Sequence, residues 1–195
     1  MTPRAILLAA LVVTGTAVAR ADEFATRLVA AAVAQTSQPV VYDGSYRRIP
    51  YPGGDVPANV GVCTDVVIRA YRALGIDLQQ RVHEDMRAAF SAYPGLWGMR
   101  GPDPNIDHRR VPNLQAFFRR RGAARRVSGD PAVYAPGDLV TWMLPGNLPH
   151  IGIVSDRRSP DGTRPLIVHN IGRGPEVEDM LLEYTITGVY RYRGE

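Results

Sequence analysis

The sequence of 195 residues contains a single cysteine, Cys63, so it cannot form an internal disulfide. In an exported protein an unpaired thiol is open to oxidation. A single cysteine in such a chain is therefore a candidate reactive group. The alternative is a buried cysteine that serves only as a small apolar residue.

The chain also lacks an apolar run of the ~20 residues that a membrane-spanning helix needs. Its N-terminal apolar stretch, residues 5–18, follows Arg4 and leads to small residues at Ala19 and Ala21. This order is typical of a secretory signal peptide. We expect residues 1–21 to be a signal peptide cleaved after Ala19 or Ala21, giving a periplasmic or secreted protein without a membrane contact. An uncleaved membrane anchor is the alternative.

Strong net charge is missing as well. The formal net charge is +4, and loss of Arg4 and Arg20 with the signal peptide lowers it by two. A net charge this small gives no reason to expect a nucleic acid as partner. Residues 22–195 suffice for one domain with a sizeable core, and no repeat or linker divides them. We expect this single domain to be a monomer.

Cys63 stands at the start of a predicted helix that Gly75 ends. The apolar residues of this segment recur at the spacing of one buried helical face: Val66, Val67, Ala70, Tyr71 and Leu74. Free N–H groups and the helix dipole at an N-terminus favour an anion and lower the pKa of a thiol. The position therefore indicates a cysteine nucleophile.

The remaining patterns place helices first and strands afterwards. Further helices are predicted over residues 23–35, capped by Asp22, over 83–93, and over 114–121, capped by Asn113. Strands are predicted over residues 40–42, 137–142, 150–154, 166–171 and 187–192, with a Pro- and Gly-rich loop over 46–60. Short strands with tight turns after a run of helices predict an α+β fold with an antiparallel sheet.

Two of the four histidines occupy matching places in this sheet. His150 begins one predicted strand, and His169 lies near the end of the next. The start of an antiparallel strand lies beside the end of its neighbour, so the two imidazoles can meet at one sheet edge. With the Cys63 helix packed across the sheet, Cys63 would be the nucleophile, His150 the base and His169 the orienting group. The Cys63 backbone N–H would be the first oxyanion donor.

Four segments, in this order, resemble the NlpC-type, papain-like cell-wall peptidases: residues 61–65, 136–140, 150–154 and 168–170. Longer stretches around residues 42–43, 51–57, 63–65 and 105–114 resemble one exported bacterial family of that group, domain of unknown function twelve-eighty-seven. The resemblance covers about residues 25–195. It implies a papain-like fold with Cys63 as nucleophile, His150 as base and His169 as orienting residue.

Two departures from that pattern concern the substrate. Val62 and Thr64 flank Cys63 in place of the usual Asp and Ser, and the insert at about residues 78–134 is longer than in simple members. We expect the insert to bring substrate-binding residues to the cleft rim: Trp97, Asp107, His108 and Arg109. Arginine suits the carboxylates of stem peptides. The alternative is that Asp107 pairs with Arg109 or Arg110 only to hold the loop.

Asp65 is expected to favour a cationic histidine nearby, or else to cap the helix. The function expected is a cysteine hydrolase that cleaves amide bonds in peptidoglycan stem peptides or cross-links, as endopeptidase or amidase, without a cofactor or metal. Two alternatives stay open. One is a zinc hydrolase with Cys63, His150 and His169 as ligands, and the other is a catalytically silent envelope or cell-wall binding module on the same fold.

Overall fold

The computed structural model describes residues 13–195, with side chains described from residue 23 onward. Its α-helices are α1 (Val13–Ala34), α2 (Cys63–Ala73), α3 (Leu78–Ala88) and α4 (Val111–Arg120). Its strands are β1 (Val41–Tyr42), β2 (Val60–Gly61), β3 (Ala124–Arg125), β4 (Leu139–Leu144), β5 (Leu148–Arg158), β6 (Pro165–His169), β7 (Glu176–Glu178) and β8 (Thr185–Tyr190). This mixture of helices and sheet confirms the predicted α+β class.

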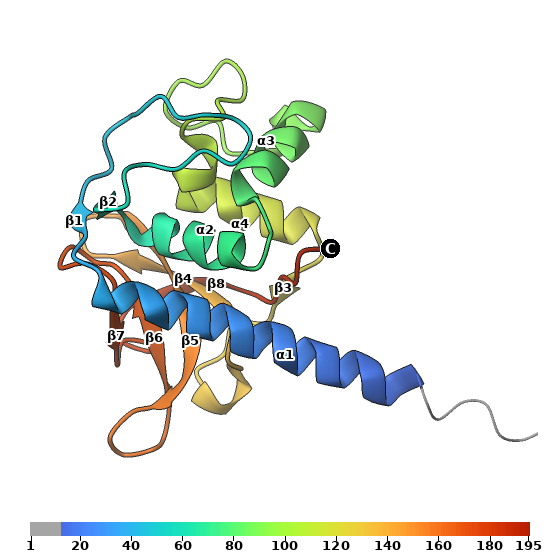
Figure 1. Ribbon diagram of the computed structural model, residues 1–195, viewed down its shortest axis with the longest axis vertical. Coiled ribbons are helices and arrows are strands. Elements are labelled where there is room, and N and C mark those ends of the chain that lie inside the picture. The colour runs from blue at the N-terminus through green and yellow to red at the C-terminus, as the bar shows by residue number, and fades with distance from the viewer. Residues whose placement is uncertain (1–12) are drawn as a thin grey trace, which may run out of the picture.

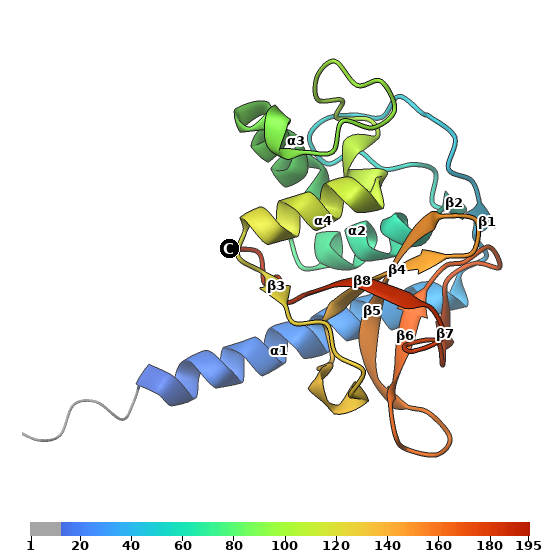
Figure 2. The ribbon, with the colours of Figure 1, turned by 180° about the vertical axis from the view of Figure 1, so that it is seen from behind.

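Six of these strands form one antiparallel sheet in the order β3-β8-β4-β5-β6-β7, while β1 and β2 form a separate parallel pair. Helices α1, α2 and α4 pack on one face of the sheet through contacts with β5, and α3 packs on α2 and α4. Figure 1 shows α1 running across the sheet with α2 beside it. From behind, Figure 2 shows β8 and β4 between the helical layer and the loops of the opposite face.

Strand residues alternate between two cores, as the period of two requires. Leu139, Ile151 and Val168 belong to the core shared with the helices. Val140, Val154 and Ile167 belong to a second cluster on the opposite face. The sheet is therefore covered on both sides, and a residue's parity along its strand decides which core it enters.

The N-terminal helix is longer than the sequence predicted. Residues 1–12 of the predicted signal peptide lie outside the described residues, and α1 begins at Val13. The prediction that Asp22 caps a helix starting at residue 23 is wrong, because the helix runs through Asp22. No proline interrupts residues 13–22, so nothing there forces a helix to end. Within the described residues, none of the helices combines the length and apolar character needed to cross a membrane.

Two other helix starts also differ. Helix α3 begins at Leu78, because the Asp77 side chain accepts hydrogen bonds from the N–H groups of the first turn. Helix α4 begins at Val111 with Pro112 in its first turn, so Asn113 is not its cap. The insert over residues 78–134 is no separate body, because α3 and α4 contribute Met86, Phe117 and other side chains to the helical core.

A close approach of β5 and β6 depends on Gly152. A Cβ atom at this position would lie 2.5 Å from Ile167 Cγ2, 3.0 Å from the Val168 oxygen and 3.1 Å from His169 Cβ. No real Cβ atom is that close to a neighbour, so a side chain here would push β6, and His169 with it, away from β5.

We therefore expect Gly152→Ala to lower the free energy of unfolding by about 1–3 kcal/mol, the usual cost of overpacking. Urea unfolding measures this change. Gly129→Ala is the matched control, because its Cβ would meet nothing within 4 Å. Equal stability of the two variants would contradict the close approach.

Candidate active site

Cys63 is the first residue of α2 and is almost completely buried. Val62 is the N-cap, and its N–H donates to Asp65 Oδ2 at 2.7 Å. The Cys63 sulfur accepts hydrogen bonds from backbone N–H groups of Ile151 and Thr64. The thiol is thus held against the backbone of the residue that follows His150.

The end of β6 explains why an N–H of β5 is available to the sulfur. Val154 donates its N–H toward β4. Because successive N–H groups of a strand point to opposite sides, that of Ile151 points toward β6. Strand β6 ends at His169, before it reaches Ile151. The Cys63 sulfur takes the position that a further strand residue would occupy.

The two predicted histidines lie together. His150 Nε2 and His169 Nδ1 are 3.0 Å apart, and the rings stand at 88° to each other. His169 Nε2 lies 3.0 Å from Glu178 Oε2 on β7. Both rings are buried. A hydrogen-bonded line therefore runs from His150 through His169 to Glu178, and Nδ1 is the His150 nitrogen outside this line.

Cysteine and histidines come from different layers of the fold. His150 pairs across the sheet with Trp142, and their ring centroids are 6.0 Å apart. Trp142 belongs to the cluster on the face opposite the helices, whereas Cys63 belongs to the helical core. The His150 side chain therefore lies on the face opposite α2, and the sulfur meets the sheet beside Ile151, the residue that follows His150.

Burial decides the charge state of this site. It raises the pKa of the Cys63 thiol to about 11, with hydrogen bonds from Ile151 and Thr64 only partly opposing the shift. Burial lowers the pKa of His150 to about 3 and that of His169 to about 4. At neutral pH the resting thiol and both imidazoles are uncharged. The expectation that the helix N-terminus lowers the pKa of the thiol is thus wrong here, because desolvation outweighs the dipole.

Tyr42 is a member of the site that sequence reasoning missed. Its side chain is 43% exposed, and partial desolvation together with the neighbouring Cys63 thiol raises the pKa of Tyr42 to about 12. Tyr42 is positioned by its parallel pairing with Gly61, which lies two residues before Cys63 in the chain. The sequence does not reveal that Tyr42 and Cys63 are neighbours, because the loop between β1 and β2 separates them and no regular spacing links them.

Asp65 and Arg109 form a buried ion pair. Arg109 Nε and Nη2 each donate to the Asp65 carboxylate at 2.9 Å, and both side chains are at most 3% exposed. Arg109 also donates to the backbone oxygens of Asp43 and Ser45. The Thr64 hydroxyl donates to the Arg109 oxygen at 3.1 Å. This pair fixes the β1 loop and the start of α2, so Arg109 is an internal clamp and not part of a cleft rim.

The other residues expected at the rim divide into two groups. Asp107 and His108 are buried, so they offer no surface to a substrate. Burial raises the pKa of Asp107 to about 6 and lowers that of His108 to about 3. Trp97 is 52% exposed, and the Arg110 guanidinium lies 4.2 Å from its ring centroid. Of the insert residues predicted to bind substrate, Trp97 alone lies at the surface.

The residues that could hold a metal ion differ from the predicted set. Among the described residues, His169, Glu176 and Glu178 have ligand atoms within 4.8 Å of one another, while Cys63 and His150 are outside this group. Arg173 forms ion pairs with both glutamates. A guanidinium therefore already balances the charge that would attract a cation.

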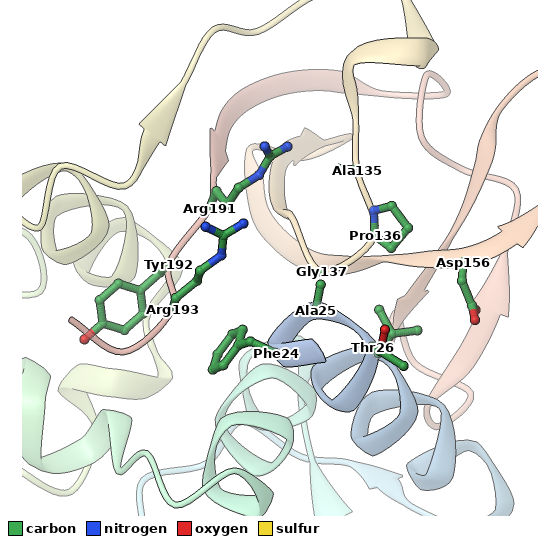
Figure 3. Close-up of a pocket in the computed structure, with 11 residues that line it drawn as sticks. Phe24, Ala25, Thr26, Ala135, Pro136, Gly137, Asp156, Arg191, Tyr192 and Arg193 are labelled. Carbon is green, nitrogen blue, oxygen red and sulfur yellow. The ribbon is translucent and has the colours of Figure 1, made fainter. Parts of the chain in front are cut away.

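A pocket of about 310 Å³ lies elsewhere, between α1, the start of β4 and the C-terminal segment. Figure 3 shows Phe24 and Tyr192 on one side of it and Asp156 on the other. Arg191 lines the pocket but is bound to Asp138 through two hydrogen bonds of 2.7 and 2.9 Å. None of the proposed catalytic residues borders this pocket.

Comparison with known proteins shows similarity along most of the chain. The family model for a domain of unknown function, DUF1287, matches residues 29–192. The chain is 51% identical over 158 residues to the uncharacterized protein YijF of Escherichia coli (strain K12), an alignment that covers 81% of this chain and 77% of that protein. No solved structure matches the chain significantly.

The clamp yields a stability prediction. We expect Arg109→Ala or Asp65→Ala to cost about 3–5 kcal/mol, because either leaves a buried charge without its partner. The double variant should cost clearly less than the sum of the two. Urea unfolding gives all three values. Arg47→Ala, which breaks the partly exposed pair with Asp43, is the control and should cost below about 1 kcal/mol. Additive losses would contradict a coupled pair.

The pKa of Cys63 can be tested directly because no other cysteine exists. A pKa about two units above the ordinary 9.0 leaves about a hundredfold less thiolate near pH 8. Iodoacetamide should therefore alkylate the folded protein far more slowly than the same chain in urea, with a rate still rising above pH 10. Mass spectrometry follows the reaction. A rate that levels off near pH 7 would show an ionised resting thiol instead.

Proposed function

The chain belongs to the DUF1287 family, and we propose that it is a cysteine hydrolase that cleaves amide bonds in the peptides of the bacterial cell wall. Cys63 would be the nucleophile, His150 the general base and His169 the orienting group. The observation that carries the proposal is the position of the Cys63 sulfur at the backbone N–H of Ile151. Ile151 follows His150, whose ring is hydrogen-bonded to the buried ring of His169.

The reaction would begin with an uncharged pair. As the sulfur attacks the carbonyl carbon of the substrate, the thiol proton moves to His150 Nδ1 and the carbonyl electron pair moves onto its oxygen. The Cys63 backbone N–H, at the start of α2, would donate to that oxyanion. The tetrahedral intermediate then collapses, the C–N bond breaks, and the amine leaves with the proton from His150.

Water completes the cycle by attacking the Cys63 thioester. His150 takes a proton from the water, the C–S bond breaks, and the carboxylic acid product leaves as the thiol is restored. His169 would stabilise the imidazolium that forms in each half-reaction, since its ring is 3.0 Å from His150 Nε2. The neighbouring Tyr42 hydroxyl, which interacts with the thiol, would stabilise charge developing on the sulfur.

The choice of cell-wall peptides rests on the predicted export and on the resemblance to NlpC-type peptidases. The papain-like arrangement, with a cysteine at a helix N-terminus and histidines on an antiparallel sheet, agrees with the α+β architecture. Exposed apolar side chains lie on the segments that flank the site. Val41 lies on β1, next to Tyr42, and Met143 and Leu148 lie at the β4–β5 hairpin, close in sequence to His150. These would contact the uncharged parts of a stem peptide.

Digestion of purified sacculi tests the proposal. We expect wild-type protein to release peptide fragments, identified by mass spectrometry, and Cys63→Ala to lose at least about a thousandfold of the rate, because covalent catalysis needs the sulfur. Arg47→Ala, on a partly exposed ion pair, serves as the folded control and should remain active.

Two results would contradict the thiol mechanism. Identical fragments from wild type and Cys63→Ala would remove Cys63 from the chemistry and favour a binding module. Loss of activity with a chelator, together with one equivalent of zinc in the purified protein, would favour the zinc hydrolase.

A further inference from the structure

Glu178 stands at the outer end of the hydrogen-bonded line and was not foreseen from the sequence. Its Oε2 atom lies 3.0 Å from His169 Nε2. In the β6–β7 pairing Glu176 lies opposite His169 and Glu178 lies opposite Ile167. Both glutamates therefore project on the face that carries the His169 ring, because residues two apart share a face.

A second contact holds this carboxylate in place. The Arg173 guanidinium binds Glu178 Oε1 and also binds Glu176, at 3.1 and 3.3 Å. Glu178 therefore presents one oxygen to arginine and the other to histidine. Its geometry is fixed from outside the site, while His169 is fully buried.

An ionised carboxylate only accepts hydrogen bonds, so the His169 nitrogen that faces it must carry the proton. A neutral imidazole with a proton on Nε2 has an acceptor at Nδ1. His150 Nε2, 3.0 Å from that atom, must then be the donor. This assignment leaves His150 Nδ1 without a proton. The opposite arrangement would set two acceptors 3.0 Å apart in a buried site, which costs the full penalty of unpaired polar groups.

We propose that Glu178 is a positioning residue of the site, whose carboxylate sets the tautomers of both histidines and so keeps His150 Nδ1 ready to accept the thiol proton. The inference rests on the proposed function for its catalytic consequence, although the tautomers themselves do not depend on it. The negative charge of Glu178 would also stabilise the imidazolium formed during turnover.

Three substitutions separate contact from charge. Glu178→Asp keeps the charge but withdraws the acceptor by one methylene. Glu178→Gln keeps an oxygen in place but loses the charge. Glu176→Gln is the matched control, since it removes a charge that also acts on His169 but leaves the hydrogen bond between Glu178 and His169 in place. Thermal unfolding confirms that each variant folds.

Ring-nitrogen NMR of protein labelled with ¹⁵N-histidine is the primary measurement, made near neutral pH. We expect His150 and His169 of the wild type to carry their protons on Nε2. Glu178→Asp should populate the Nδ1–H form of His169 and lower the initial rate on sacculi about tenfold. Glu178→Gln should retain the tautomers and lose less activity, and Glu176→Gln should retain both.

A wild-type His169 protonated on Nδ1, or unchanged tautomers in Glu178→Asp, would overturn the proposal. These results are distinguishable from failure of the proposed function. If Cys63→Ala digests sacculi as the wild type does, the hydrolase assignment fails whatever the tautomers. If only Cys63→Ala is inactive while Glu178→Asp matches wild type in rate and tautomer, the role of Glu178 fails alone.

Discussion

The hydrogen bond from the Ile151 N–H to the Cys63 sulfur connects the start of α2 to the sheet at the candidate site. It exists because β6 stops at His169, one step short of covering Ile151. A longer β6 would satisfy that N–H within the sheet and leave the start of α2 without a place to dock. The register of an antiparallel pair thus determines where a reactive atom from another layer can sit.

Burial sets the chemistry that can follow. The same enclosure that orders the site keeps its thiol protonated and its imidazoles neutral. In the proposed reaction, charge would therefore arise only during turnover. Fixed charge is placed one layer further out, in the Asp65–Arg109 clamp and in Glu178. In the proposed mechanism, such preorganised charge would stabilise a transient ion without placing a permanent one beside Cys63.

The sequence predicted much of this arrangement and missed what depends on long-range contacts. The α+β class, the helix that begins at Cys63, and the pairing of His150 with His169 follow from periodicity and strand order. Strand β7 has three residues and β1 two, too short for any period, so Glu178 and Tyr42 were not assigned roles. The sequence suggested an exposed polar segment at Asp107, His108 and Arg109. In the structure all three side chains are buried, and Asp107 and Arg109 form ion pairs.

Strand β7 has a further consequence, for solubility. It is the last strand of the sheet on its side, with no neighbour beyond it. Open edges invite pairing with other chains, and proteins discourage this with short strands and charged side chains. Three residues, two of them glutamates held by an arginine, meet both conditions. The Glu178 carboxylate, proposed to orient the site, would therefore also discourage pairing of this edge with another chain.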